Sequence, residues 1–240
     1  VAAVWGLFNQ NISIDQIRED PRIIGFSAKW YGGPPARFWS EYHHGRVPML
    51  TKVGELLDEA DAVVTFNGKS FDQPWIHGEL EREGLPFPSP YRTIDLYKIS
   101  KAFRFPSHKL QYVSTALGQE GKLATGGFKL WRDCLWNEDT ATKKRAWSKM
   151  RRYCNRDVNE LEPLYDRLRP YFPATLNLAT AGGNFEMVCT VCESEHLQSR
   201  GWAFSGSRRY RRYQCQNCGK WLRDTHSEPG EAAPLTAVAR

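Results

Sequence analysis

The sequence predicts an α/β fold, in which a mixed sheet is flanked by helices. Short apolar runs that are rich in β-branched residues, such as residues 62–66, are typical of buried strands. Segments with apolar residues at helical spacing alternate with these runs, and the longest of them covers residues 140–168. Strands that alternate with helices along one chain favour a sheet covered by helices.

The elements follow one another in a clear order. Two strands, at 22–31 and 36–42, are joined by a Gly-Gly-Pro-Pro turn, and a helix at 49–60 leads into the strand at 62–66. That strand ends at Asn67-Gly68, a dipeptide that favours a turn. We expect a helix at about 72–83, a strand at 93–96, helices at about 97–103, 108–117 and 140–168, and a loop with one short helix at 119–138.

Length and composition place the chain among ordinary globular proteins. Its 240 residues, 41% of them hydrophobic and 25% charged, suffice for one sizeable domain and a small one. No apolar run approaches the roughly 18–20 residues that span a bilayer, and the start at Val1 shows no signal-peptide pattern. We therefore expect a soluble, intracellular protein without a membrane partner.

Four of the six cysteines form two C-x2-C pairs, which are separated by 22 residues. This spacing is typical of tetrahedral Zn²⁺ held by four thiolates in a closed structural site. About 40 residues bury too little core to fold alone, so the metal would supply the folding energy. The sequence predicts a small four-cysteine zinc ribbon at 186–224 with these ligands: Cys189, Cys192, Cys215 and Cys218.

The net charge of +6 is concentrated near the C-terminus. Residues 197–223 contain seven Lys or Arg and no acid, so the rest of the chain sums to 6 − 7 = −1. Arginine binds phosphates and aromatic rings stack on bases, so this segment favours a nucleic-acid partner. A solvated hairpin on a protein-docking ribbon is the alternative. The interleaved basic and aromatic residues are Arg208, Arg209, Tyr210, Arg211, Arg212 and Tyr213.

Two acids and a tyrosine predict a second metal site. Tyr153 and Asp157 are four residues apart on a helical pattern and therefore share one face. Asp72 follows the strand at 62–66, where open α/β sheets place their chemistry. Carboxylate and phenol oxygens suit Mg²⁺ or Mn²⁺, and two such ions can clamp the oxygens of a phosphodiester during cleavage.

The same segments resemble the DEDD-type 3′–5′ exonucleases of the ribonuclease H-like superfamily. Residues 67–72 match the motif N-x3-F-D, residues 153–157 match the tyrosine form of Y-x3-D, and the resemblance covers about residues 1–170. It implies that Asp72 and Asp157 bind metal and that Tyr153 positions the attacking water. It also implies that Asn67 and Phe71 help to hold the scissile end of the strand, and Lys69 of the same loop is a further candidate for nucleic-acid binding.

The resemblance implies a two-metal 3′–5′ exonuclease that acts on a single-stranded 3′ end of DNA or RNA, with the zinc ribbon aiding binding. The layout is similar to phage or bacterial nucleases, which implies a bacterial or phage-infected cytoplasm. Asp95 matches a family position more loosely, and a strand-end or helix-capping role is equally open. The expected domains are the exonuclease domain at 1–175, a linker at 176–185, the ribbon at 186–224 and a disordered tail at 225–240.

One motif of the family is missing. Its first, central strand carries D-x-E, which supplies two of the four acids, and the sequence contains no D-x-E. We therefore expect an N-terminally truncated chain that is inactive as given, and a catalytically inactive nucleic-acid-binding protein is the alternative function. A ribbon-based adaptor for a protein partner is a weaker third. The basic run at 143–152 is either a solvated helix face or a guide for a phosphate backbone.

Overall fold

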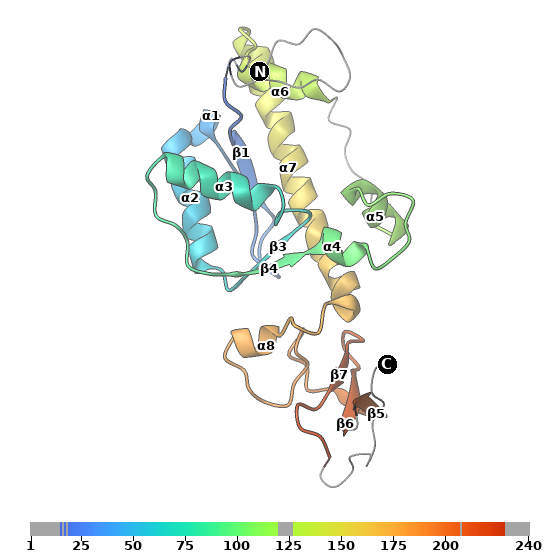
Figure 1. The fold of residues 1–240 in the computed structure, drawn as a ribbon. Coiled ribbons are helices and arrows are strands. Elements are labelled where there is room, and N and C mark those ends of the chain that lie inside the picture. The colour runs from blue at the N-terminus through green and yellow to red at the C-terminus, as the bar shows by residue number, and fades with distance from the viewer. Residues whose placement is uncertain (1–14, 16, 18, 120–126, 207, 229–240) are drawn as a thin grey trace. The chain divides into compact units, whose positions relative to one another are not determined.

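The computed structural model describes residues 15, 17, 19–119, 127–206 and 208–228 (Figure 1). The chain forms two compact units. The first comprises residues 1–60, 68–91 and 123–158, and the second comprises 61–67, 92–122 and 159–240. The long helix α7 (Thr140–Leu168) contributes residues to both units.

The first unit contains an antiparallel strand pair and several helices. Phe26 lies opposite Trp39 in the pair, and their rings stack with centroids 5.1 Å apart. Ser40 caps the helix that follows this pair, because its hydroxyl accepts a hydrogen bond from the His43 amide. The elements are β1 (Gly25–Ala28), β2 (Arg37–Ser40), α1 (Glu41–His44), α2 (Arg46–Glu59), α3 (Asp72–Arg82), α6 (Phe128–Leu135) and most of α7.

Two kinds of packing hold the first unit together. Helices α2 and α3 contact each other, and the buried carboxylate of Glu79 on α3 is neutralised by Arg46 on α2. Helix α6 packs on α7 through a cluster around Trp147, whose indole N–H donates to the Cys134 carbonyl at 3.0 Å. This cluster covers the side of α7 that also carries Tyr153.

The second unit contains a parallel strand pair and the cysteine-rich segment. Strand β3 (Ala62–Thr65) pairs with β4 (Arg92–Asp95), so that Thr65 lies opposite Asp95. Three antiparallel strands form the C-terminal sheet in the order β5-β6-β7. The other elements are α4 (Leu96–Ser100), α5 (Leu110–Ala116), the end of α7, η2 (Arg169–Tyr171), α8 (Leu178–Ala181), β5 (Leu197–Ser205), β6 (Arg208–Cys215) and β7 (Trp221–Arg223).

The cysteine-rich segment shares its core with the rest of the second unit. Cys189 and Cys215 belong to one buried cluster with Ile94 of β4 and Leu168 of α7. Lys220, which is only 9% exposed, donates from its ammonium group to backbone carbonyls just after α7. The segment therefore gains apolar burial that its own 40 or so residues do not supply.

Most predicted elements are confirmed, and the differences have local causes. Helix α2 begins at Arg46, three residues earlier than predicted, because Gly45 (φ +84°) makes the turn before it. Helix α5 begins only at Leu110 because Lys109 is extended. The predicted linker at 176–185 contains α8, and residues 229–240 of the predicted tail lie outside the described residues.

The predicted α/β composition is confirmed, but the strands of the predicted mixed sheet pair differently. In the described part of the chain they form two separate two-stranded sheets, β1-β2 antiparallel and β3-β4 parallel. Strand pairing is set by contacts between distant residues, which local sequence patterns do not encode. No helix among the described residues is long and apolar enough to cross a membrane.

Candidate functional site

Asn67 and Asp95 meet where β3 and β4 end, because parallel strands finish at the same edge of a sheet. The Asn67 amide donates to Asp95 Oδ1 at 2.7 Å, and the Tyr97 amide donates to the same oxygen at 3.2 Å. Asn67 has φ +67°, a left-handed conformation that asparagine tolerates better than most residues. Asp95 is thus a capping acid that also holds the Asn67 turn in place.

Asp72 begins α3, and the loop before it presents two further predicted residues to solvent. The carboxylate lies in the first turn of the helix, where the macrodipole favours negative charge. The loop is closed by the Gly68 carbonyl, which accepts from the amides of Phe71 (3.3 Å) and Gln73 (2.9 Å). The Phe71 ring is 60% exposed and Lys69 is also exposed, so both are accessible to a ligand.

Tyr153 and Asp157 lie one turn apart on α7, as predicted. The Tyr153 ring meets Trp131 edge to face, with centroids 6.4 Å apart, and packs against the cluster around Trp147. Nearby on α7, Asn155 accepts a hydrogen bond from the Ser27 hydroxyl of β1 at 2.7 Å. These contacts hold this stretch of α7 and restrict the Tyr153 ring.

The oxygen donors of the first unit suit a hard divalent cation. Asp72, Tyr153 and Asp157 all belong to that unit and offer two carboxylates and a phenol. Mg²⁺ and Mn²⁺ prefer such ligands over nitrogen or sulfur. One carboxylate oxygen of Asp157, Oδ1, is buried, and a cation bound beside it would stabilise the charged carboxylate.

The four predicted cysteines lie together in the second unit. Their sulfur atoms are all within 4.8 Å of one another, and the Cys189–Cys218 and Cys192–Cys215 sulfurs are each 3.6 Å apart. Four sulfurs at about 2.3 Å from a tetrahedral zinc ion would be roughly 3.8 Å apart. The arrangement therefore fits Zn²⁺ held by four thiolates.

The thiol pKa values differ within this cluster. Burial raises the pKa of Cys189 and of Cys218. Burial also acts to raise the pKa of Cys192, but hydrogen bonds from the Ser194 amide, the Asn217 side chain and two neighbouring thiols together outweigh it and lower this pKa to about 7. Cys192 is thus ready to ionise near neutral pH, whereas Cys189 and Cys218 need a nearby cation to become thiolates.

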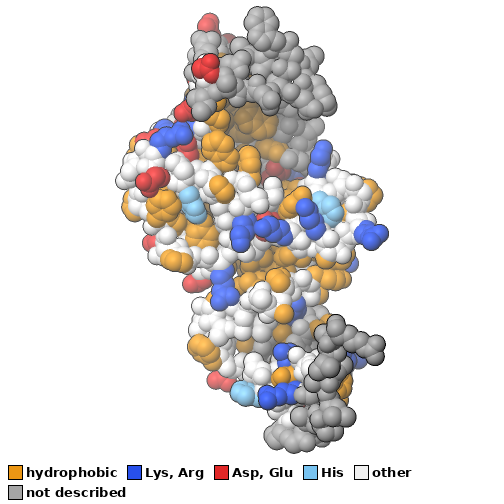
Figure 2. All heavy atoms as spheres, viewed as in Figure 1, with side chains coloured by type: hydrophobic (Ala, Val, Ile, Leu, Met, Phe, Trp, Pro, Cys, Tyr) orange, Lys and Arg blue, Asp and Glu red, His pale blue; other side chains and the backbone are white. Residues whose placement is uncertain are grey.

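The C-terminal sheet stacks its arginines on aromatic rings from neighbouring strands. Trp202 of β5 lies between two guanidinium groups of β6, with Arg209 at 4.0 Å and Arg211 at 4.1 Å from the ring centre. Two further pairs join β6 to β7, Arg223 over Tyr210 at 4.0 Å and Arg212 over Trp221 at 4.7 Å. Lys and Arg side chains are visible over this part of the chain in Figure 2.

The sequence predicted the basic residues of β6 with Trp221 and Arg223 nearby, but neither Trp202 nor which arginine stacks on which ring. Trp202, Trp221 and Arg223 come next to β6 only through the strand register, in which Trp202 pairs with Arg211 and Arg223 pairs with Arg212. The sequence signal for these stacks is a basic strand with Trp202 before it and Trp221 after it. We call β5, β6 and β7 together with the four cysteines the ribbon.

Comparisons with known proteins add one positive result. No match was found among curated proteins. A family model described as the RNase_H superfamily matches residues 36–169. The matched region contains Asn67, Asp72, Asp95, Tyr153 and Asp157 and ends before the ribbon. Because the model covers more than half of the sequence, the chain belongs to the RNase H superfamily.

Proposed function

We propose that this protein is a metal-dependent 3′–5′ exonuclease of the tyrosine-form DEDD type, which hydrolyses phosphodiester bonds of DNA or RNA. RNase H-like proteins are usually nucleases that use divalent metals and bind nucleic acid. The observation that carries the finer proposal is the ordered pair of motifs, N-x3-F-D at 67–72 and Y-x3-D at 153–157, inside the matched region.

Asp72 and Asp157 would hold two Mg²⁺ or Mn²⁺ ions. When bound, such ions neutralise charge on the scissile phosphate and acidify the attacking water. The Tyr153 hydroxyl would orient that water for attack on the phosphorus. Its contact with Trp131 restricts the ring, so the hydroxyl keeps its direction without a further loss of entropy.

The loop before α3 would hold the end of the strand. Phe71 offers an exposed ring on which the terminal base can stack, and Lys69 offers a cation for a nearby phosphate. The Asn67 side chain can hydrogen-bond to the strand, because its backbone is held in a left-handed turn by Asp95. In this proposal Asp95 is a positioning residue.

The ribbon would add affinity for single-stranded nucleic acid. A structural Zn²⁺ on the four cysteines would fix the turns at the base of the hairpins. The arginines of β6 can bind phosphates, while the partly exposed ring of Trp221 can stack on an unpaired base. A single-stranded 3′ end is therefore the proposed substrate.

A second candidate function is nucleic-acid binding without cleavage. The sequence contains no D-x-E, the motif that supplies the first two carboxylates in DEDD exonucleases. With only Asp72 and Asp157 as acidic ligands, the site would hold two cations poorly, since each divalent ion needs several oxygen donors. We therefore expect residues 1–240 alone to bind but not to cleave.

One experiment tests both functions. The 240-residue chain and the same chain with an added N-terminal apolar strand ending in D-x-E are incubated with 5′-labelled single-stranded DNA or RNA and Mg²⁺ or Mn²⁺. We expect stepwise shortening from the 3′ end by the extended chain only. Asp157→Asn in the extended chain should slow cleavage by about 100-fold or more, because several kcal/mol of charge stabilisation are lost.

Two outcomes would contradict the proposal. If the extended chain is folded and does not cleave, the exonuclease assignment is wrong and the binding function stands. If the unextended chain cleaves and loses this activity with Asp157→Asn, the D-x-E motif is not needed and the inactive alternative is wrong. A digestion ladder that starts at the 5′ end of 3′-labelled strands would reject the proposed polarity.

A further inference from the structure

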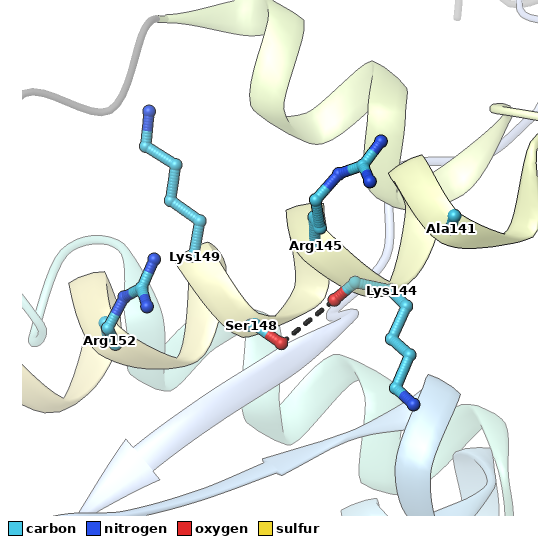
Figure 3. A pocket seen from close by; sticks show the side chains of 6 residues that line it. All are labelled: Ala141, Lys144, Arg145, Ser148, Lys149 and Arg152. Carbon is cyan, nitrogen blue, oxygen red and sulfur yellow. Dashed lines mark hydrogen bonds between the residues drawn. The ribbon is translucent and has the colours of Figure 1, made fainter.

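The N-terminal half of α7 carries a basic hollow of about 590 Å³. Figure 3 shows that its described lining residues all come from this helix, with Arg145, Lys149 and Arg152 extending to one side and Lys144 to the other. The Ser148 hydroxyl lies between them and donates to the Lys144 carbonyl at 3.0 Å. We call this feature the α7 hollow; its residues are Ala141, Lys144, Arg145, Ser148, Lys149 and Arg152.

The positive charge of the α7 hollow is largely unbalanced. Residues 140–156 contain seven Lys or Arg and no acid. Arg145 has a distant carboxylate neighbour, Asp139 at 4.0 Å, and a hydrogen bond to Thr142. Within the described part of the chain, Lys144, Lys149 and Arg152 have no ion pair, and they are exposed. Four cations around one concave surface repel each other unless an anion binds there.

The centre of the α7 hollow lies on a different side of the helix from the proposed catalytic residues. An α-helix turns about 100° per residue, so Ser148 at the centre of the hollow is about 180° from Asp157 and about 140° from Tyr153. Lys149, four residues before Tyr153, is only about 40° from it and lies at the border of the two faces. The Tyr153 side of α7 packs against α6, whereas the basic residues of the hollow face solvent. Lys149 therefore borders the Tyr153 face, whereas Ser148, Lys144 and Arg152 lie well away from it.

We propose that the α7 hollow binds the phosphodiester backbone of a nucleic-acid strand as a second contact, separate from the Tyr153–Asp157 face and from the ribbon. Lys144 and Arg152 are eight residues apart, about 12 Å along the helix. Phosphates of one strand follow each other every 3.4 Å or so along a duplex axis, so the hollow spans about three or four of them. Its described lining contains no aromatic ring, which favours the backbone over the bases.

The proposal does not depend on catalysis. Backbone contacts that neutralise phosphates release counterions, and each one steepens the dependence of log affinity on log salt by about 0.7–0.9. The number of cations of the hollow that contact phosphates can therefore be measured from the salt dependence of binding, without any cleavage assay. Loss of the cations should weaken the binding of both single- and double-stranded DNA of one sequence, since both present phosphates to the hollow.

The test compares two triple variants by fluorescence anisotropy with labelled strands of about 20 nucleotides, over a salt series and without added Mg²⁺ or Mn²⁺. Lys144→Gln/Lys149→Gln/Arg152→Gln should lower the salt slope by about 2–3 and the affinity at low salt by about tenfold or more. The control, Lys52→Gln/Lys98→Gln/Lys109→Gln, removes the same charge elsewhere and should leave the slope unchanged. Glutamine is a good helix former, so circular dichroism should show no loss of helix in either variant.

A third variant guards against a folding artefact. Lys144→Arg/Lys149→Arg/Arg152→Lys keeps every charge, and it should retain the slope of the unmodified chain. An unchanged slope in the glutamine variant, or an equal fall in the control, would overturn the proposal. Loss of binding to an acidic polypeptide but not to DNA would also overturn it, in favour of a protein partner. The assay measures binding and not cleavage. If Asp157→Asn has the same salt slope as the unmodified chain, the α7 hollow binds nucleic acid whether or not the nuclease proposal is correct.

Discussion

The ribbon and the α7 hollow are both basic, but they hold their cations in different ways. In the ribbon, Arg209 and Arg211 lie at 4.0 and 4.1 Å from the Trp202 ring, and the sheet that carries them is tied to the four-cysteine cluster. In the α7 hollow, Lys144 and Lys149 extend from a single helix with no ring among the described lining residues.

This difference separates two ways of binding a polyanion. A guanidinium group that is stacked on a ring has lost much of its freedom before the ligand arrives, so less entropy is lost on binding. A lysine on an open helix face acts as a mobile point charge and follows the phosphates wherever they run. The ribbon is therefore suited to order a strand, and the α7 hollow to attract it.

The loss of zinc should produce the largest difference between the ribbon and the α7 hollow. The binding of structural zinc contributes on the order of 10 kcal/mol to folding in small zinc modules, so Cys215→Ser should unfold the ribbon sheet. Cys215 also packs with Ile94 and Leu168, so the second unit should lose stability as well. We expect one zinc per chain in the unmodified protein, measured with a chromophoric chelator, and at least a tenfold loss of affinity for single strands in Cys215→Ser.

The α7 hollow should survive that change, because its residues belong to the first unit. The zinc-free chain should still show a salt slope that falls with Lys144→Gln/Lys149→Gln/Arg152→Gln. If zinc loss abolishes all binding, or if the unmodified chain binds no zinc, the two surfaces are not independent in the way described.

The next largest effect should come from Trp221, whose ring is 47% exposed on β7. Stacking of one base on an aromatic ring is worth about 1–3 kcal/mol, so Trp221→Leu should weaken single-strand binding by about 5- to 150-fold. Duplex binding should change little, because paired bases are not free to stack. Trp30→Leu, which removes a ring that is 45% exposed in the first unit, is the matched control.

Equal losses for single strands and duplexes would show that Trp221 supports the ribbon rather than the bases. Zinc content and near-ultraviolet circular dichroism of Trp221→Leu would reveal such a loss of structure. The α7 variants, in contrast, should weaken both kinds of strand to a similar extent.

Regular local patterns were the part of the fold that the sequence predicted well. Helix α7 runs from Thr140 to Leu168 as predicted, because its apolar spacing is long and Pro170 follows its end. The cysteine spacing likewise predicted a cluster that the structure brings together. Tyr153 and Asp157 share a helix face because that follows from their separation alone.

Features that depend on contacts between distant residues were not predicted. The separate pairing of β1-β2 and β3-β4 is one example, and the shared core of Cys189 with Ile94 and Leu168 is another. Trp202 came next to Arg209 and Arg211 only through the register of β5 on β6. The capping role of Asp95 is seen in the structure, where the Tyr97 amide donates to its carboxylate, and its role in catalysis stays a prediction.

The smallest and most selective effect should come from exchanging arginine for lysine. Arg209→Lys/Arg211→Lys keeps both charges but loses the planar stacking on Trp202, which is worth about 0.5–1 kcal/mol for each exposed pair. We expect a loss of single-strand affinity of about five- to thirtyfold for the two pairs together, with an unchanged salt slope, in the same anisotropy assay. Arg145→Lys/Arg152→Lys in the α7 hollow should change affinity by less than about twofold, since charge alone acts there. Equal losses at both places would mean that the rings do not order the ribbon's arginines for binding, and that the two surfaces differ in position only.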